Sequence, residues 1–214
     1  MRFTKIFIFL FALSFVSGAS VNNSFSQVTG AASSAADVKP IAVGEKIPDV
    51  TLKNAKGEPV SLTTLAGEKQ TILVFFRGGW CPYCNKQLMG LQKIESDLTA
   101  LGYQIVAITA DKPEKISETV TNDELKYTIL SDNNSDASIA FGIAFKVDDA
   151  TVEKYKGYNL DLDEASGNSN HILPVPSVFI LDKQGKIKYE YVNPDYKVRL
   201  DENKLLEEAK NNKQ

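Results

Sequence analysis

The chain has 214 residues, 43 % of them hydrophobic and 24 % charged, a composition typical of a soluble globular protein. This length predicts one domain with additional segments rather than two full domains. The formal net charge is −3 and the pI is near 5.3. No basic run is present, which excludes the charge pattern of a nucleic-acid-binding protein.

The N-terminus has the order of residues typical of a secretory signal. Arg2 and Lys5 precede an apolar run over 6–16, and small residues follow at Ser17 and Ala19. This order predicts a signal peptide at 1–19 that is cleaved after Ala19. An uncleaved anchor is the alternative, but a membrane span needs roughly 18 apolar residues. We therefore expect an exported protein, periplasmic or extracellular, without stable membrane insertion after cleavage.

The segment after the expected signal differs in composition from the rest of the chain. Residues 20–40 are rich in Ser, Ala and Asn and show no apolar periodicity. Such composition is typical of a flexible linker. We expect the folded domain to cover 41–214.

Strand and helix patterns alternate through this domain, with buried strands marked by continuous apolar runs and helices by three- and four-residue spacing. Alternation of this kind, ending in a hairpin and a helix, favours an α/β fold with a mixed central sheet. The expected elements are two short strands around Gly57, a strand at 71–76, a helix at 82–101, a strand at 103–109, a helix at 115–121, a strand at 127–130, a helix at 137–141, a hairpin at 176–192 around Gly185, and a helix at 201–210 capped by Asp201.

One long segment, 142–173, is acidic and poorly periodic. It is consistent with a lid over a functional site or with a solvated insertion, and the second is the commoner explanation for such a segment.

The chain holds only two cysteines, Cys81 and Cys84, in the sequence "FFRGGWCPYCNKQL". A disulfide between them would close a loop too short to stabilise the fold appreciably. Two cysteines and the single histidine do not complete a four-ligand zinc site. Redox chemistry is therefore the favoured role of the pair, and we expect neither a metal nor another cofactor.

The position of the cysteines also favours redox chemistry. They follow a buried strand and begin a helix, where unpaired N–H groups and the positive helix pole lower the pKa of a thiol. Arg77 adds positive charge, and Pro82 suits the first helical position. The sequence thus predicts that Cys81 is the nucleophile and that Cys84 resolves what it attacks.

Cys-x-x-Cys after a strand, with Trp80 before it, resembles the thioredoxin fold. The sequence "VPS" at 175–177 resembles the cis-proline loop of that fold, so Pro176 is expected to be cis and to orient an incoming partner. Trp80 and Tyr83 are candidates for an apolar rim where a partner docks, although aromatic residues in such places are also common in packing.

The resemblance extends to a larger family. The sequences "GEKIPDVTLKNAKGEPVSL" and "PSVFILDKQGKI", with the strand and helix after "IVAITAD", resemble the alkyl hydroperoxide reductase/thiol-specific antioxidant (AhpC/TSA) family, and "RGGWCPYC" resembles its peroxiredoxin-like branch. The match runs from about 43 to 210. It implies a thioredoxin-like α/β fold, with a mixed central sheet flanked by helices and a peroxiredoxin-type insertion.

The family pattern and the cysteine pair differ in one respect. In the family's register the peroxide-reacting cysteine falls on Cys84, Cys81 takes the place of a threonine, and Pro176 takes the place of an arginine. In the thioredoxin register no residue is missing, because Cys81 attacks, Cys84 resolves and Pro176 orients the partner.

Three functions remain from the sequence. The first is a thiol-dependent peroxidase that reduces small peroxides, with a thioredoxin-like thiol reductant as electron donor, as the family resemblance implies. The second is a thiol–disulfide oxidoreductase acting on exported proteins. The third is a non-catalytic binding module with a vestigial disulfide.

Overall fold

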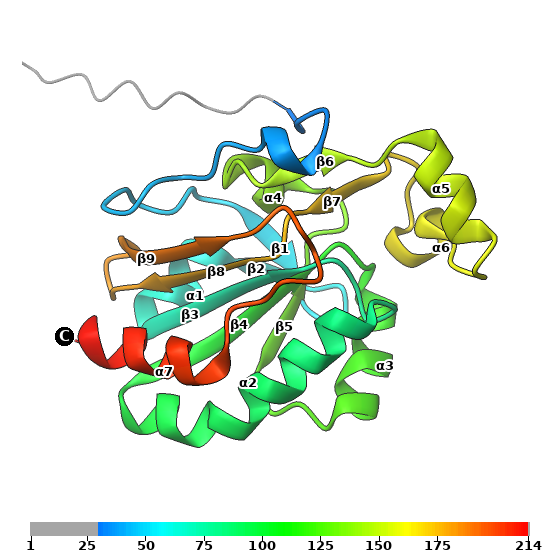
Figure 1. The fold of residues 1–214 in the computed structure, drawn as a ribbon. Coiled ribbons are helices and arrows are strands. Elements are labelled where there is room, and N and C mark those ends of the chain that lie inside the picture. Colours follow the sequence, from blue (N-terminus) through cyan, green and yellow to red (C-terminus); the bar gives the residue numbers. More distant parts are fainter. Residues whose placement is uncertain (1–29, 214) are drawn as a thin grey trace, which may run out of the picture.

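The computed structural model describes residues 30–213 (Figure 1). The expected signal at 1–19 and the first part of the expected linker therefore lie outside the described residues. Within 30–213, no helix combines the length and the apolar character needed to cross a membrane.

A seven-stranded mixed sheet forms the centre of the fold, with the strand order β2-β1-β5-β4-β3-β8-β9. The three central strands β5, β4 and β3 are parallel, and the strands at both edges run antiparallel to their neighbours. The strands of this sheet are β1 (Thr51–Lys53), β2 (Pro59–Ser61), β3 (Gln70–Phe76), β4 (Tyr103–Thr109), β5 (Thr128–Ser131), β8 (Ser177–Leu181) and β9 (Ile187–Val192).

Helices cover both faces of this sheet, and two further helices lie with a small ribbon at one end (Figure 1). The ribbon pairs β6 (Ala144–Lys146) with β7 (Ile172–Pro174). The helices are α1 (Leu62–Glu68), α2 (Pro82–Ala100), α3 (Pro113–Asp123), α4 (Asp136–Ala140), α5 (Asp149–Lys156), α6 (Leu162–Ser166) and α7 (Glu202–Asn211), with a 3-10 turn at Ala35–Asp37.

The central strand β3 is buried along its whole length because its alternate side chains enter two different cores. Ile72 and Val74 pack with residues of α2, α3 and α7 on one face. Leu73 and Phe75 pack with residues of α1 and α4 on the other face. Between two apolar layers, β3 is held rigidly up to Phe76, the last residue before the cysteine loop.

The expected order of strands and helices is confirmed, with boundaries that differ by a few residues. The two short strands around Gly57, the buried strands, the long helix and the final hairpin are all present. Asp201 caps α7, because its side chain accepts hydrogen bonds from two backbone N–H groups of the first turn.

The structure differs from expectation in two segments. The second part of the expected linker is attached to the body, since the Ala32 N–H donates to Ala144 O at 2.9 Å and Ala32 forms a bridge with Phe145. The segment 142–173 holds β6, α5, α6 and β7 and has its own small apolar cluster. Each of its two helices buries only one or two side chains, so the sequence shows no apolar period there.

Candidate active site

The cysteine pair lies where β3 ends and α2 begins. Cys81 is the residue just before the first helical residue, Pro82, and Cys84 lies one turn into the helix. The backbone closes this turn, because the Cys84 N–H donates to Cys81 O at 2.9 Å and the Cys81 N–H donates to Gly78 O at 3.1 Å. Both thiols are buried and not bonded to each other. The exposed fraction is 2 % for Cys81 and 0 % for Cys84.

The surroundings of Cys81 favour its thiolate. A hydrogen bond from the Cys84 side chain lowers the pKa of Cys81 to about 6, helped by the Cys84 backbone N–H and the charges of Arg77 and Arg199, although burial acts in the opposite direction. Thiolates are the reactive form of cysteine. Cys81 is thus suited to act as a nucleophile near neutral pH.

The surroundings of Cys84 have the opposite effect. Burial raises the pKa of its thiol well above the ordinary value, and donation of its hydrogen bond to Cys81 raises it further. One cationic group opposes this rise, because Arg199 Nη2 lies 3.3 Å from Cys84 Sγ. Cys84 is therefore a protonated hydrogen-bond donor while Cys81 is a thiolate.

Arg77, the arginine expected beside the pair, is 4 % exposed and surrounded by aromatic rings. Its guanidinium carbon lies 4.9 Å from the ring centre of Trp80, 5.5 Å from that of Tyr155 and 4.3 Å from that of Tyr196. Its Nη2 also donates a short hydrogen bond to Tyr155 Oη. Cation–π contacts hold the positive charge without neutralising it, so that charge continues to act on Cys81.

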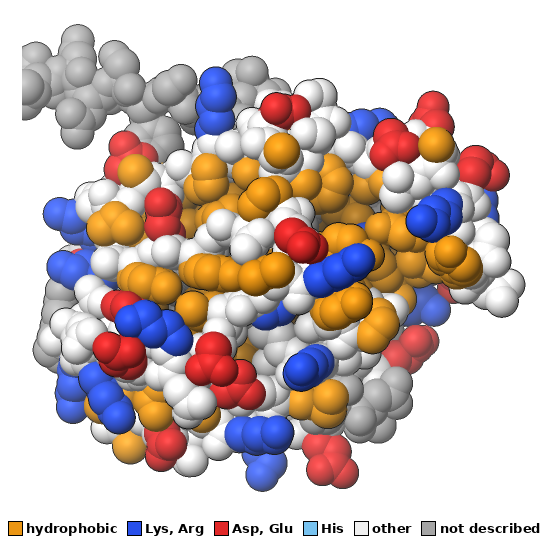
Figure 2. Space-filling view, in the orientation of Figure 1, with side chains coloured by type: hydrophobic (Ala, Val, Ile, Leu, Met, Phe, Trp, Pro, Cys, Tyr) orange, Lys and Arg blue, Asp and Glu red, His pale blue; other side chains and the backbone are white. Residues whose placement is uncertain are grey.

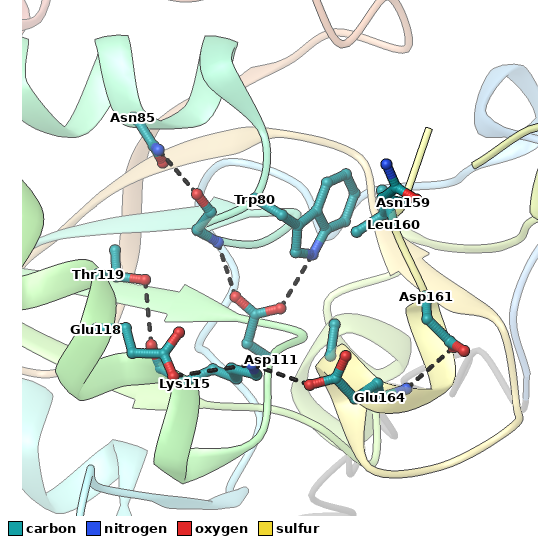
Figure 3. Close-up of a pocket in the computed structure, with 12 residues that line it drawn as sticks. Trp80, Asn85, Asp111, Lys115, Glu118, Thr119, Asn159, Leu160, Asp161 and Glu164 are labelled. Carbon is teal, nitrogen blue, oxygen red and sulfur yellow. Dashed lines mark hydrogen bonds and ion pairs between the residues drawn. The ribbon is translucent and has the colours of Figure 1, made fainter. Parts of the chain in front are cut away.

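The glycines before the pair are required by close contacts. A Cβ on Gly78 would lie 2.1 Å from Trp80 Nε1, and one on Gly79 would lie 2.1 Å from Thr119 Oγ1. The loop is held by the buried carboxylate of Asp111, which accepts from the Gly79 N–H at 2.7 Å and from Trp80 Nε1 at 3.1 Å (Figure 3). Burial raises the pKa of Asp111 to about 6.

A polar pocket of about 260 Å³ opens beside this loop, between α3 and α6. In Figure 3 Asp111 lies at the centre of the view, between Trp80 above it and Lys115 and Glu164 below. The ammonium group of Lys115 lies 3.1 Å from a carboxylate oxygen of Glu164. The pocket is lined by the loop before the cysteines and not by the thiols themselves.

The expected cis bond at Pro176 is wrong, because no peptide bond among residues 30–213 is cis. The backbone contacts of Val175 and Ser177, on either side of Pro176, explain why this peptide bond is trans. The Val175 N–H donates to Ile143 O at 2.8 Å next to the β6–β7 ribbon, and Ser177 pairs with Phe75 of β3. The chain therefore passes from ribbon to sheet in extended form, which the intrinsically preferred trans isomer allows. Pro176 is buried at this crossing.

The expected aromatic rim is divided between two environments. Trp80 is half-buried and packs against the small cluster of the 142–173 segment. Tyr83 is 39 % exposed and meets the ring of Tyr196 edge to face, with 5.7 Å between the centres. Figure 2 shows apolar side chains gathered at the surface where the α5–α6 lobe meets the body. Tyr158 of that lobe is 70 % exposed.

Four residues of the site were missed from the sequence: Tyr155, Tyr196, Arg199 and Asp111. Asp111 could have been found, because it follows the parallel neighbour of β3 and so lies at the same edge of the sheet. Nothing in the local sequence around Tyr155, Tyr196 and Arg199 indicates contact with the cysteine loop.

No group of three or more His, Cys, Asp or Glu in the described part of the chain is arranged to hold a metal ion. His171 instead contacts the carboxylate of Asp163, with 2.7 Å between Nε2 and Oδ1. This contact lies within the 142–173 segment.

The sequence of this chain is similar to the sequences of known peroxiredoxins. The model of the AhpC/TSA family matches residues 43–190. A putative peroxiredoxin bcp of Haemophilus influenzae is 32 % identical over 106 residues, which cover 50 % of this chain and 68 % of that protein. Peroxiredoxin Bcp of Escherichia coli K12 is 30 % identical over 106 residues, covering 50 % and 67 %.

Solved structures show the same fold at lower identity. Peroxidoxin BcpB from Mycobacterium tuberculosis superimposes with a TM-score of 0.63 and 16 % identity, over 81 % of this chain and 99 % of that one. Reduced Prx3 from Vibrio vulnificus, in complex with hydrogen peroxide, gives a TM-score of 0.64 and 17 % identity, over 79 % and 99 %. The mixed sheet flanked by helices is thus the thioredoxin-like fold of peroxiredoxin structures.

Proposed function

We propose a catalytic cycle on the premise that this chain belongs to the AhpC/TSA family, in its peroxiredoxin-like part, and is therefore a thiol-dependent oxidoreductase of the peroxidase type. In this cycle Cys81 reduces a peroxide and Cys84 resolves the product through an intramolecular disulfide. The observation that carries the proposal is the position of Cys81 at the start of α2, one turn from Cys84, whose backbone N–H donates to Cys81 O at 2.9 Å.

The first step is attack by the Cys81 thiolate on a peroxide oxygen. An S–O bond forms and the O–O bond breaks, so that Cys81 becomes a sulfenic acid and the second oxygen leaves, with a proton, as water or an alcohol. The positive charges of Arg77 and Arg199 and the helix pole favour the attacking thiolate. The family's own polarising threonine and arginine positions are occupied by Cys81 and Pro176, so we expect a slower peroxidase than one with the full set.

The second step forms the disulfide. The Cys84 sulfur attacks the Cys81 sulfur, the S–O bond breaks, and the oxygen leaves as water. A thioredoxin-like dithiol reductant then supplies two electrons and two protons, which restores both thiols. The backbone hydrogen bond that joins the two cysteines supports this step, since it places them in one helical turn.

A second function, thiol–disulfide exchange on exported proteins, is favoured by a separate observation. Cys81 stands where the family has a threonine, and the exposed ring of Tyr83 lies beside the pair. In this function Cys81 attacks a protein disulfide, and Cys84 releases the bound partner from the mixed disulfide.

Rates measured side by side distinguish the two functions. We would measure the second-order rates of the reduced protein with hydrogen peroxide and with a scrambled disulfide substrate. Cys84→Ser should retain one peroxide turnover and leave a sulfenic acid on Cys81, whereas Cys81→Ser should lose the initial reaction. If Cys81→Ser reduces peroxide at the wild-type initial rate, the assignment of Cys81 is wrong. A much faster reaction with the disulfide substrate would favour the second function.

We also propose that the protein is exported, to the periplasm or the outside of the cell. The order of charged, apolar and small residues over 1–19 supports this proposal. N-terminal sequencing of the mature protein, recovered from fractionated cells, should find Ser20 as its first residue. Recovery from the cytoplasmic fraction with Met1 retained would contradict it.

A further inference from the structure

Arg199 belongs to the segment between β9 and α7, far from the cysteines in sequence, and its side chain is held against Cys84. Its Nη2 donates to Cys84 Sγ at 3.3 Å, its Nη1 donates to Gln87 Oε1 at 2.7 Å, and its Nε donates to Tyr196 O at 2.8 Å. Three bonds from three different nitrogens fix the plane of the guanidinium. In the described part of the chain no carboxylate forms an ion pair with Arg199.

The contact with Arg199 offsets the energetic cost of ionising the buried Cys84 thiol. Its side chain is fully buried, and burial disfavours the charged form of a thiol. To resolve an oxidised Cys81, however, Cys84 must attack as a thiolate. Once Cys81 is oxidised, it no longer carries the negative charge that accepts the hydrogen bond of Cys84. Arg199 is then the charged donor that the structure places on the Cys84 sulfur.

We propose that Arg199 is a catalytic residue of the resolving step, in which it stabilises the Cys84 thiolate as that sulfur attacks Cys81. This inference rests on the proposed function only for the order of attack, Cys81 first and Cys84 second. In the step, the Cys84 thiol loses its proton to solvent, the S–S bond forms, and the group bound to Cys81 leaves with the electron pair of the broken bond. Arg199 exchanges no proton or electron, and a charged hydrogen bond of this kind strengthens as the sulfur gains negative charge.

Arg77 does not duplicate this role. Its guanidinium is enclosed by Trp80, Tyr155 and Tyr196, and its charge acts on Cys81 more strongly than that of Arg199 does. The charge of Arg199 lowers the pKa of Cys84, whereas Arg77 lowers it through a backbone hydrogen bond. Loss of Arg199 should therefore affect the second step much more than the first.

A chromogenic disulfide separates the two steps without peroxide. When the reduced protein is mixed with 5,5′-dithiobis(2-nitrobenzoate), attack by Cys81 releases one thionitrobenzoate and leaves a mixed disulfide. Attack by Cys84 on the Cys81 sulfur then releases the second thionitrobenzoate and forms the intramolecular disulfide. The first phase depends on reagent concentration and the second does not, so stopped-flow absorbance gives both rates.

Arg199→Gln is the main variant, because Gln keeps a polar side chain without the charge. Arg199→Lys keeps the charge without the three fixed donors. Lys197→Gln is the matched control, since it removes one positive charge two residues away. Lys197 is exposed and contacts the Tyr196 ring rather than a thiol. Because the reagent is an anion, this control also corrects for loss of general attraction.

We expect Arg199→Gln to slow the second phase about 10- to 100-fold, the range for loss of a charged hydrogen bond, and to change the first phase less than about threefold. Arg199→Lys should fall between this variant and wild type, and Lys197→Gln should leave both phases unchanged. The second phase of Arg199→Gln should also require higher pH, because ionisation of Cys84 is harder without the cation.

Several outcomes would overturn the proposal. A second phase that is unchanged in Arg199→Gln, or both phases slowed equally in a variant with the wild-type circular dichroism spectrum, would contradict it. Slowing confined to the first phase would mean that Cys84 attacks first. If the dithiobis phases behave as expected but the reduced protein does not consume peroxide at all, the peroxidase function fails and the role of Arg199 stands.

Discussion

The two thiols lie in one turn of the same helix, but different parts of the molecule surround them. On the Cys81 side are the start of α2 and the caged charge of Arg77, and together with the Cys84 thiol they favour a thiolate. On the Cys84 side are the apolar core below the sheet and a single cation, Arg199. The two residues are chemically identical, so their different roles as nucleophile and resolving thiol arise from differences in burial and in the hydrogen-bond donors around each sulfur.

The largest change in the acidity of Cys81 is expected when the main cause of this asymmetry, the hydrogen bond from Cys84, is removed. In the wild type, alkylation of Cys81 by iodoacetamide should rise with pH around a midpoint of about 6, because the thiolate predominates above that pH. Cys84→Ala removes the donor, and the midpoint should move up towards the ordinary thiol range near 8.5. Mass spectrometry of the labelled site across a pH series measures both midpoints.

Cys84→Ser is the matched control, because its hydroxyl can still donate to the Cys81 sulfur. Its midpoint should stay closer to that of the wild type. Equal midpoints in Cys84→Ala and the wild type would show that the hydrogen bond does not set the acidity of Cys81.

The next effect concerns the loop that supports both thiols. Gly79→Ala would place a methyl group 2.1 Å from Thr119 Oγ1 on α3. Overpacking of this kind costs about 1–3 kcal/mol, so the urea midpoint of unfolding should fall. Thr119→Ala in the same chain removes the clashing oxygen and should recover part of the loss.

Gly67 in α1 provides an opposite control, since a Cβ there meets nothing within 4 Å. Gly67→Ala should leave stability unchanged or raise it by up to about 1 kcal/mol, because alanine is the better helix former. A Gly79→Ala protein as stable as Gly67→Ala would mean that α3 adjusts without cost.

A smaller change is expected in the pKa of Cys81 when the charge of Arg77 is removed. Arg77→Met keeps a long side chain among the three rings but removes the charge. The pKa of Cys81 should rise, by less than after Cys84→Ala, because the charge of Arg77 is a weaker cause than the hydrogen bond. The same pH series of alkylation measures the change. A midpoint that does not move would show that the aromatic cage screens Arg77 from the sulfur.

The smallest effect on the acidity of Cys81 is expected from a change that tests the link between the 142–173 segment and the site. Tyr155→Phe keeps the ring over Arg77 but removes the oxygen that accepts the bond from Nη2. Unfolding in urea should show a loss of about 1.5–3 kcal/mol at most, the range for a hydrogen bond to a charged group. The alkylation midpoint of Cys81 should stay nearly constant. A midpoint that moves as far as in Arg77→Met would give Tyr155 a larger part in placing the charge.

Much of the fold could be predicted because its signals are local. The run at 71–76, the apolar spacing after Pro82 and the capping residue Asp201 each identify an element within a few residues. The two helices of the 142–173 segment were missed because each buries only one or two side chains, so the acidic segment shows no apolar period. The isomer of Pro176 depends on how the ribbon meets the sheet, which a resemblance of three residues does not determine.

For the site, the position of the nucleophile could be predicted from the local sequence. Cys81, Pro82 and Cys84 lie within one turn after a buried strand, so the local backbone alone places one thiol at the helix start and the other inside. The charges that act on the two thiols depend instead on tertiary packing. Tyr155 and Arg199 reach the site from 78 residues beyond Arg77 and 115 residues beyond Cys84. Contacts over such separations depend on how the central sheet, the α5–α6 lobe and the C-terminal segment pack together. A pattern of residues within a single turn of the chain does not predict that packing.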